Sequence, residues 1–370
     1  MDSSQKKPFF TVGLPTYNRP EYFRMTLESC LKQDYPSYEV IVSDDSKDDQ
    51  IRDIVDSFGS DKVRYVKNDP PLGIPAKLND ITSRAAGPWM LMVGDDDLLE
   101  PDFLSRMAAI IEEHSDAAMV RSRFRLIDEE GKALMMDVLD KSSMSPYEFM
   151  TTIFRPWYKM RISITGFVFP LENLKRIGGF LDFYQGHCID RVAWAMLAAQ
   201  GTTYFDPEPL VSIRLNPDAL SLQFIPDYKM LLDSKERIYR TINELFDGLD
   251  AGARDENDRS NMRRARVMAK EFIIDESEYF LDKILVHLLK QKKIFVGPEV
   301  KAMMQAVRAS EVPFLSLLRF RLFSSYGLCI SILPEFFRRA ALSVVLKIRH
   351  AHMILFPPPT FSVRETAEGR

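Results

Sequence analysis

Cysteine is scarce in this chain of 370 residues, which contains three of them. Cys30, Cys188 and Cys329 lie far apart, so they form neither the paired spacing of a zinc site nor the framework of a disulfide-rich secreted domain. This usage is typical of the reducing cytosol, and we therefore expect a cytoplasmic protein.

Long apolar runs are missing as well. The sequence has no stretch of about 20 apolar residues, which is the length that a membrane-spanning helix needs. The N-terminal stretch MDSSQKKPFF also lacks the apolar segment of a secretory signal peptide. Neither a spanning helix nor a signal peptide is therefore predicted.

An excess of charge is absent too, because the formal net charge is −4. Nothing in this balance predicts nucleic-acid binding. The phosphate-binding patterns G-x-x-x-x-G-K-[ST] and G-x-G-x-x-G do not occur, and neither does the Gly-rich N-terminal signature that nucleotidyl transfer would need. Hydrophobic residues make up 46% of the chain and charged residues 28%, which is ordinary for a globular protein.

What the chain does have is an alternation of strand-like and helix-like patterns over residues 1–125. Buried strands are predicted at 9–14, 38–43, 63–67, 89–93 and 117–127, and helices from 18–20 onward and at 50–58, 76–85 and 102–113. Strands that alternate with helices favour an α/β fold with a mostly parallel sheet sandwiched between helices.

Acidic residues gather where two of these strands end. In parallel sheets, ligands bind at the carboxyl ends of the strands. Here Asp44 and Asp45 follow the second predicted strand, and residues 95–97, all aspartates, follow the fourth. Like charges this close repel one another, so a cation or a cationic ligand is expected at this edge. The alternative is that Asp44 and Asp45 simply form turns.

The rest of the chain is predicted to be less regular and then helical. Residues 140–225 mix strand-like, loop-like and helical patterns, and charged and apolar periodicity follows Pro226. We therefore predict a catalytic domain over residues 1–225, a helical C-terminal region over 226–356 and a disordered tail over 357–370.

Residues 314–356 are apolar and basic. Basic amphipathic helices can lie in the interface of an anionic membrane, so peripheral contact with the inner face of the cytoplasmic membrane is one hypothesis. The other is that these helices pack on the catalytic domain or on a second copy of the chain, which would make a homo-oligomer. The sequence leaves both open.

Four segments, in this order, resemble family-2 glycosyltransferases of the GT-A fold. They are VGLPTYNRPEYFRMTLESCLKQDYPSYEVIVSDDS, LGIPAKLNDI, MLMVGDDDLLEPDFL, and GGF followed by Asp190. The resemblance covers roughly residues 8–220. It implies an enzyme that moves a sugar from a nucleotide-diphosphate donor to a glycan or lipid-linked acceptor with inversion at the anomeric carbon. UDP is the expected nucleotide by family habit, and GDP and dTDP stay open.

The resemblance also implies roles for residues at the donor side. Pro15 and Tyr17 match the first-strand exit that lines the nucleotide pocket. Asp45 matches the acid that reads a nucleobase N–H group, and Lys77 falls in the segment that reaches the base or the phosphates. Asp95 would lie near the ribose or the metal. On their own, Lys77 would be read as a solvated charge and Tyr17 as a packing residue.

The same resemblance implies a metal ligand and a general base. Asp96 would bind Mn²⁺ or Mg²⁺, a hard cation that neutralises the charge building on the leaving phosphates. Asp190 matches the general base, which removes the proton of the attacking hydroxyl. Without the resemblance, the alternative is that Asp190 simply caps its helix.

Two departures from the family pattern bear on function. Members often carry an Arg-x-His loop whose histidine lies near the metal, whereas this chain has Arg214 followed by Asn216. An amide is a poor substitute ligand, so weak metal affinity is expected. Many relatives also have an acidic pair where this chain has Ile189 and Asp190.

Two other functions compete with transfer. One is a catalytically lapsed protein of the same fold that binds nucleotide sugars, which Asn216 favours. The other, less well supported, is an aspartate phosphoacceptor of the receiver type, which also uses acids at strand exits. Against it, the acidic pair follows the second strand, the acidic triple follows the fourth, and the chain is far too long.

Overall fold

The computed structural model describes residues 7–137, 139–154, 163–183, 186–216 and 228–290. The predicted boundary near residue 225, the basic region 314–356 and the tail 357–370 lie outside this part of the chain. The chain divides into two compact units. The first contains residues 1–154, 160–219 and 245–265, and the second contains 155–159, 220–244 and 266–370.

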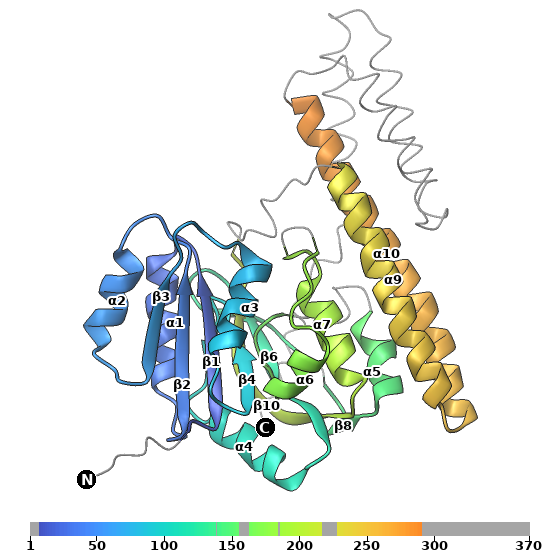
Figure 1. Ribbon diagram of the computed structural model, residues 1–370, viewed down its shortest axis with the longest axis horizontal. Helices are drawn as coiled ribbons and strands as arrows, with labels where there is room; N and C mark the ends of the chain where they lie inside the picture. The colour runs from blue at the N-terminus through green and yellow to red at the C-terminus, as the bar shows by residue number, and fades with distance from the viewer. Residues whose placement is uncertain (1–6, 138, 155–162, 184–185, 217–227, 291–370) are drawn as a thin grey trace, which may run out of the picture. The chain divides into compact units, whose positions relative to one another are not determined.

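The first unit is built on one mixed sheet (Figure 1). Its strands are β1 (Phe10–Thr16), β2 (Tyr38–Asp44), β3 (Val63–Lys67), β4 (Trp89–Met92), β5 (Leu98–Leu99), β6 (Ala117–Ile127), β7 (Ala133–Met136), β8 (Ser143–Met144), β9 (Phe167–Pro170) and β10 (Thr202–Arg214). Their order is β3-β2-β1-β4-β9-β6-β10-β5, with β7 beside β6 and β8 beside β10.

Six strands of this sheet run in one direction. The pairs β1–β2, β2–β3, β1–β4 and β6–β10 are parallel, and β9 is antiparallel to both β4 and β6. Because β9 is antiparallel to both of its neighbours, β6 and β10 point the same way as β1 to β4. The prediction of an α/β fold with a mostly parallel sheet is therefore confirmed, with β9 and the short strands β5, β7 and β8 as the antiparallel members.

Helices cover both faces of the sheet (Figure 1). In this unit they are α1 (Pro20–Leu31), α2 (Gln50–Phe58), α3 (Ile74–Arg84), α4 (Phe103–Glu113), α5 (Pro146–Ile153), α6 (Leu171–Arg176) and α7 (Ile189–Ala198). The limits of β3, β6 and α2 are those expected from the sequence. The helices α5 and α6 and the short strands β5, β7 and β8 were not expected.

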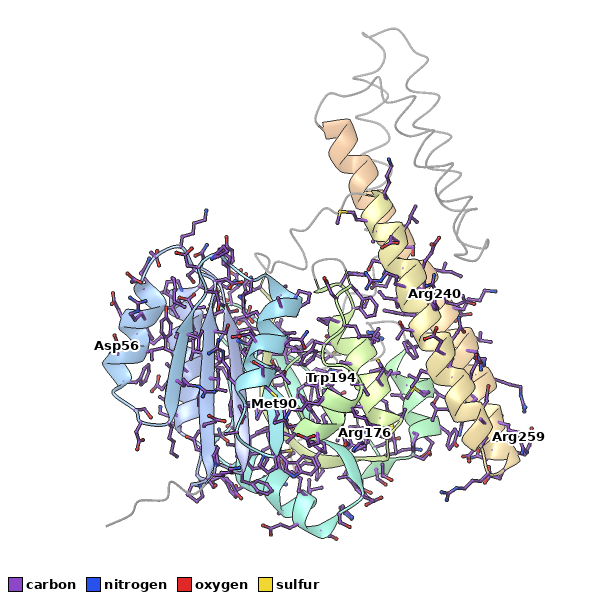
Figure 2. All side chains as sticks on the ribbon, viewed as in Figure 1. Asp56, Met90, Arg176, Trp194, Arg240 and Arg259 are labelled. Carbon is purple, nitrogen blue, oxygen red and sulfur yellow. The ribbon has the colours of Figure 1, made fainter. Side chains whose placement is uncertain are left out.

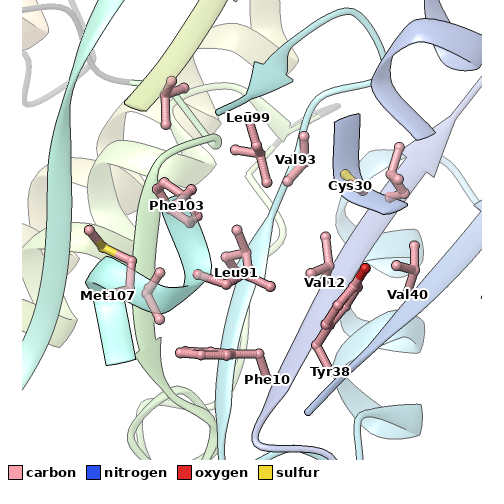
Figure 3. Close-up of a cluster of buried hydrophobic side chains, with 14 of the residues drawn as sticks. Phe10, Val12, Cys30, Tyr38, Val40, Leu91, Val93, Leu99, Phe103 and Met107 are labelled. Atoms are coloured by element: carbon pink, nitrogen blue, oxygen red, sulfur yellow. The ribbon is translucent and has the colours of Figure 1, made fainter. Parts of the chain in front are cut away.

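The face toward α1, α2 and α4 holds the main core (Figure 3). Alternate residues of the central strands, such as Val12, Val40 and Leu91, pack there against Cys30 of α1 and Phe103 of α4. This period of two is what a strand with a buried face requires. Burial of apolar surface, at roughly 25 cal/mol per Å², is the main force that holds these layers together.

The opposite face carries α3 and α7. Gly13 of β1 faces α3 so closely that a Cβ atom would lie 2.5 Å from Met92 Sδ and 2.7 Å from Ile81 Cγ2. On the same side, Trp194 of α7 stacks on Phe167 of β9 with ring centroids 4.9 Å apart. Glycine at position 13 thus lets α3, the helix that carries Lys77, lie close to the strand that ends at the candidate site.

The described part of the second unit is helical. It includes segments of α9 (Tyr228–Gly252) and α10 (Glu256–Lys290), which were expected as helices from the sequence. Lys235 Nζ lies 3.7 Å from Glu276 Oε2, which joins the two helices within this unit. In the portions of the chain given above, we find no helix whose length and apolar character would suit it to crossing a membrane.

Candidate active site

The carboxyl ends of β1, β2 and β4 meet at Thr16, the last residue of β1. Thr16 pairs with Asp44 in the register of β1 and β2, and its carbonyl oxygen accepts a hydrogen bond from Asp45 N at 3.2 Å. Its hydroxyl donates to Asp95 Oδ2 at 3.1 Å. The structure thus brings together the two acidic segments that the sequence placed at separate strand exits.

The first acidic segment, which we call the β2 corner, consists of Asp44 and Asp45. Both carboxylate oxygens of Asp45 are engaged. Oδ1 accepts from Asn68 Nδ2 at 2.8 Å and from Leu72 N at 3.1 Å, and Oδ2 accepts from Gly73 N at 3.0 Å. The fourth contact is Lys77 Nζ, at 3.0 Å from Oδ2. Four donors match the acceptor capacity of a carboxylate.

Lys77 is not the solvated charge that its position on a helix suggests. Its side chain is 5% exposed, and its ammonium donates to Thr16 O at 2.8 Å as well as contacting Asp45. Burial alone would raise the pKa of Asp45, but the Lys77 charge and the hydrogen bonds from Asn68 and Leu72 outweigh burial and lower that pKa. Asp45 is therefore held as an anion in a buried ion pair.

Asp44 is also fully partnered by the chain. Its Oδ2 accepts from the Tyr65 hydroxyl at 2.7 Å and lies 3.2 Å from Lys67 Nζ, while its Oδ1 accepts from Ser46 N at 2.7 Å. The last of these contacts closes a turn of the kind that aspartate favours. Asp44 thus shapes the β2 corner rather than facing a ligand.

The second acidic segment, the β4 corner, consists of Asp95, Asp96 and Asp97. Asp95 Oδ2 accepts from Tyr17 N at 3.2 Å. Arg19 Nη1 lies 3.4 Å from Asp95 Oδ1 and 2.9 Å from Asp96 Oδ2. The guanidinium of Arg19 therefore contacts both carboxylates that the resemblance assigns to the metal and its surroundings.

Asp97 faces inward and holds other segments in place. Its Oδ1 accepts from Arg214 N at 3.0 Å, and its Oδ2 accepts from the Thr165 hydroxyl. Thr165 Oγ1 in turn accepts from Gly94 N at 2.8 Å. Asp97 thus fastens the end of β10 and the segment before β9 to the turn after β4.

The β4 corner has the opposite electrostatics to the β2 corner. Burial raises the pKa of Asp95 to about 6, against the lowering effect of Arg19. Burial together with the charge of Asp96 raises the pKa of Asp97 to about 7. Burial raises the pKa of Asp96 as well, although Arg19, Arg214 and a hydrogen bond from the Asn216 side chain pull it down.

Asn216 lies where the resemblance leads one to expect a histidine. It is buried, and its side chain hydrogen-bonds to Asp96. Arg214 is locked nearby, because its Nε donates to Asp96 O at 3.1 Å and its Nη1 to Glu129 O at 2.7 Å. Residue 216 therefore adjoins Asp96, the predicted metal ligand, but its side chain is an amide rather than an imidazole.

Asp190 lies in the first turn of α7, and its Oδ1 accepts from Arg191 N at 2.7 Å. Residues four apart share a helix face, so Asp190 is on the side of Trp194. Trp194 Nε1 donates to Ser163 O at 3.1 Å (Figure 2, where Trp194 is labelled), two residues before the Thr165 that binds Asp97. The face of α7 that carries Asp190 is therefore linked to the β4 corner.

The loop that leads to Asp190 is fixed to α3. Asn79 Nδ2 donates to Phe180 O at 2.8 Å, and Phe180 N donates to Asn79 Oδ1 at 2.9 Å. Further along the loop, a Cβ atom on Gly186 would come within 2.9 Å of Ile74 Cγ2. Asp190 and Lys77 are thus carried by segments that contact each other.

The chemistry that this arrangement can support follows from its donor set. Asp96 is a partly exposed carboxylate, which is the oxygen ligand that Mg²⁺ and Mn²⁺ accept. One carboxylate suffices when the phosphates of a ligand and water complete the coordination. The residues therefore fit a divalent ion at Asp96, provided that Arg19 gives up its contact there.

Sequence reasoning missed the residues that hold this site together. In the sequence, Arg19 falls at the first strand exit and in the predicted helix start, and no role is predicted for Thr16, Asn79 or Thr165. The signal for Arg19 was present but ambiguous, since it follows the first strand exit directly. No local pattern indicates the contacts of Asn79 or Thr165.

Comparisons with known proteins agree with this geometry. Residues 11–177 match the family model described as Glycosyl transferase family 2. A poly(ribitol-phosphate) β-N-acetylglucosaminyltransferase, TarS of Staphylococcus aureus, is 33% identical over 119 residues, which is 31% of this chain and 21% of that protein. The chain thus spans about a fifth of the length of TarS.

Two further relatives are similar over different lengths. An uncharacterized glycosyltransferase, RT0329 of Rickettsia typhi, is 25% identical over 217 residues, which is 58% of this chain and 67% of that protein. The putative colanic acid biosynthesis glycosyl transferase WcaA of Escherichia coli is 29% identical over 103 residues, which is 27% of this chain and 37% of that protein.

Among solved structures, S. aureus TarS residues 1–349 in complex with UDP-GlcNAc has the same fold. It superposes with a TM-score of 0.53 and 16% identity, covering 76% of this chain and 87% of that one. At this identity the likeness concerns the fold alone, and it supports the GT-A architecture that the sequence implied.

Proposed function

Residues 11–177 belong to glycosyl transferase family 2, and from this premise we propose that the chain is an inverting, metal-dependent glycosyltransferase. It moves a sugar from a nucleotide-diphosphate donor, by preference a UDP-sugar, to a hydroxyl group of a glycan or lipid-linked acceptor. The observation that carries the proposal is the meeting of both acidic corners at Thr16, where β1, β2 and β4 end. The relative TarS, by name an acetylglucosaminyltransferase, supports a sugar donor.

The β2 corner is the side proposed for the nucleotide. Pro15 and Tyr17 would line the pocket, and Asp45 would accept an N–H group of the base. Because Asp45 already has four donors, a base can bind there only by exchange with one of them, such as the Leu72 amide or the Lys77 ammonium. A released Lys77 would then pair with a phosphate of the donor.

The β4 corner is the side proposed for the diphosphate and the metal. Asp96 would hold Mn²⁺ or Mg²⁺, and Asp95 would lie between the metal and the ribose. Such an ion, when bound, stabilises the negative charge that builds on the leaving diphosphate. Asn216 cannot add the strong nitrogen ligand that a histidine would, so the proposal includes weak metal affinity in the absence of donor.

Asp190 is proposed as the general base. The acceptor oxygen forms a bond to the anomeric carbon, its proton passes to a carboxylate oxygen of Asp190, and the bond between that carbon and the diphosphate oxygen breaks. The nucleoside diphosphate leaves with the electron pair. A single displacement inverts the anomeric centre, and base catalysis of this kind typically contributes about 10²–10⁴-fold in rate.

A second candidate is a protein of this fold that binds nucleotide sugars without transferring them. Asn216 favours it, because the position next to Asp96 lacks a histidine. The aspartate phosphoacceptor alternative loses its ground, since residues 11–177 belong to a transferase family. Contact of residues 314–356 with a membrane, and a homo-oligomer, stay hypotheses, which co-sedimentation with anionic liposomes and light scattering would test.

The first experiment screens UDP-, GDP- and dTDP-sugars for thermal stabilisation and hydrolysis, with Mn²⁺ and with EDTA. A transferase should be stabilised by one donor class, and EDTA should abolish hydrolysis. Asp190→Asn should then lose about 10²–10⁴-fold in hydrolysis or transfer while keeping nucleotide binding. Asp182→Asn, an exposed acid of the same loop, is the matched control. Binding without turnover in the wild type would favour the second candidate.

A further inference from the structure

Arg19 occupies a position in the chain that local structure does not explain. It is the residue immediately before α1, where serine, threonine, asparagine or aspartate normally caps the helix. Its side chain forms no cap, and that of the preceding Asn18 accepts from Lys47 N at 3.2 Å in the turn beyond β2. The Arg19 side chain is directed instead to Asp95 and Asp96.

The contacts of Arg19 are those of a partly buried ion pair rather than a surface one. The side chains of Arg19, Asp95 and Asp96 are 18%, 13% and 15% exposed. Salt screens such a pair less than it screens charges in open solvent. One guanidinium nitrogen lies near both carboxylates, so Arg19 supplies positive charge at the edge where the clustered acids require it.

We propose that Arg19 is a built-in competitor of the divalent ion, which it keeps off Asp96 until a diphosphate arrives to bind the guanidinium instead. This inference rests on the proposed function. In the donor-free protein, an ion can reach Asp96 only in the fraction of molecules in which Arg19 has withdrawn. Apparent affinity falls in proportion to that fraction.

The diphosphate of a donor offers Arg19 a second anionic partner. Guanidinium binds phosphate through strong, charge-assisted hydrogen bonds. Transfer of Arg19 from Asp96 to the diphosphate frees the carboxylate for the metal. Metal and nucleotide diphosphate thus favour each other's binding, and the coupling is reciprocal by linkage. Arg19 in this account acts on the metal through Asp96 and binds the diphosphate directly.

The experiment measures Mn²⁺ binding to the full chain by electron paramagnetic resonance, without and with UDP. Arg19→Gln should bind Mn²⁺ without UDP about tenfold or more tightly than the wild type, because the competing cation is gone. The same variant should bind UDP without metal about tenfold more weakly, whereas binding of uridine, which has no phosphate, should not change. The factor by which UDP strengthens Mn²⁺ binding should shrink accordingly.

Two variants serve as comparisons. Arg24→Gln makes the same change on the exposed side of α1, where Arg24 Nη1 is 3.4 Å from Ser57 Oγ, and should leave all three affinities unchanged. Arg19→Lys keeps a charge but loses the planar fork, so its gain in Mn²⁺ affinity should be smaller and of the same sign. It also provides the test if Arg19→Gln fails to fold.

Several outcomes would overturn the inference. They are unchanged or weaker Mn²⁺ binding in folded Arg19→Gln and Arg19→Lys, an equal gain in Arg24→Gln, and a gain that vanishes in 0.5 M KCl, which would indicate a general charge effect. In each case, wild type that still binds UDP with Mn²⁺ leaves the proposed function standing. Wild type that binds no nucleotide with Mn²⁺ contradicts the proposed function itself.

Discussion

The β2 corner and the β4 corner both place aspartates at the end of a buried strand, yet the pKa shifts of Asp45 and of the β4-corner aspartates have opposite signs. In the β2 corner, Lys77 and three further donors saturate Asp45 and lower its pKa. In the β4 corner, burial and mutual repulsion raise the pKa of Asp95 to about 6 and of Asp97 to about 7, with Arg19 as a counter-charge for Asp95. Residue type and strand position are the same, and the partners differ.

The difference shows what clustered acids do and do not imply. A cluster of carboxylates needs positive partners, but the chain can supply them itself through Lys77, Lys67 and Arg19. The charge argument therefore predicts a cation at this edge without saying whether it is a metal. The β2 corner is satisfied as it stands, whereas the β4 corner retains acids that a stronger cation would stabilise further.

The largest expected effect lies in the β2 corner. Asp45→Asn should reduce the free energy of unfolding by about 3–5 kcal/mol, because it leaves the buried Lys77 without its anion and turns an amide nitrogen toward other donors. Urea denaturation at pH 7 measures this loss.

Asp56→Asn on α2 is its control, since that carboxylate is exposed and the change should cost about 0.5 kcal/mol or less (Figure 2). Replacing both partners, as Asp45→Asn with Lys77→Met, should recover part of the loss. Equal stability of the single variant and the wild type would mean that the two corners do not differ as described.

The next effect concerns Thr165, which ties Asp97 to the turn after β4. Thr165→Val removes the hydroxyl that donates to Asp97 and accepts from Gly94 N, so a partly buried N–H group loses its partner. We expect about 1–3 kcal/mol less stability by urea denaturation. Thr165→Ser keeps the hydroxyl and should retain most of the stability; an equal loss in both would point to the methyl group instead.

A smaller effect is the pH dependence of folding stability, which differs between the two corners. In metal-free protein, the raised pKa of Asp97 means that the folded state binds more protons than the unfolded state between about pH 4 and 7. Stability contributed by this group therefore falls as pH rises through that window. For Asp45, whose pKa is lowered, stability instead falls as pH drops below about 4.

Asp97→Asn should flatten the decline between pH 4 and 7. Relative to the wild type, the variant should gain roughly 2 kcal/mol at pH 8 compared with pH 5, since the wild type loses up to about 1.4 kcal/mol per pH unit between pH 5 and the raised pKa. Thermal unfolding in EDTA across this range measures the gain. The exposed acid in Asp61→Asn should leave the slope as it is, and a parallel pair of curves for Asp97→Asn would refute the raised pKa.

The smallest effect is a change in Mn²⁺ affinity, which tests the β4 corner as a metal site. Asn216→His places an imidazole beside Asp96, and imidazole is a better ligand for Mn²⁺ than an amide. We expect Mn²⁺ affinity in the presence of UDP to rise about threefold to tenfold by isothermal titration calorimetry. Asn216→Gln, which lengthens the side chain but keeps the amide, should show no such rise. An unchanged affinity for the histidine variant would place the ion elsewhere.

Local pattern was enough to predict most of the central fold. The strands β3 and β6 and the helix α2 have the limits that their apolar periodicity indicated. The antiparallel insertion of β9 between β4 and β6 could not be predicted, because pairing between distant strands leaves no local signal. β10 (Thr202–Arg214) contains two prolines and pairs with β6 through several register shifts, so its alternation is too irregular to set its limits from the sequence.

The helix α5 could have been found from the sequence. Ser145 followed three residues later by Glu148 is a capping box, and both of its hydrogen bonds are formed. The contacts of the site could not have been found this way. Arg19 meets Asp96 across 77 positions, and Asn79 meets Phe180 across 101. The acids could be predicted as a group, but their partners come from segments that meet only once the sheet has assembled.

The paired hydrogen bonds of Asn79 have a mechanical consequence. They join α3 to the backbone of Phe180 through both an acceptor and a donor, so a shift of α3 would have to move Phe180 as well or break both hydrogen bonds. Helix α3, which carries Lys77, is therefore tied at this point to the segment that precedes Asp190. If α3 moved when a nucleotide bound at Lys77, the Asn79 contacts would pass that movement to the segment that precedes Asp190, the proposed general base. Donor binding and the position of the base would then be coupled through a single asparagine.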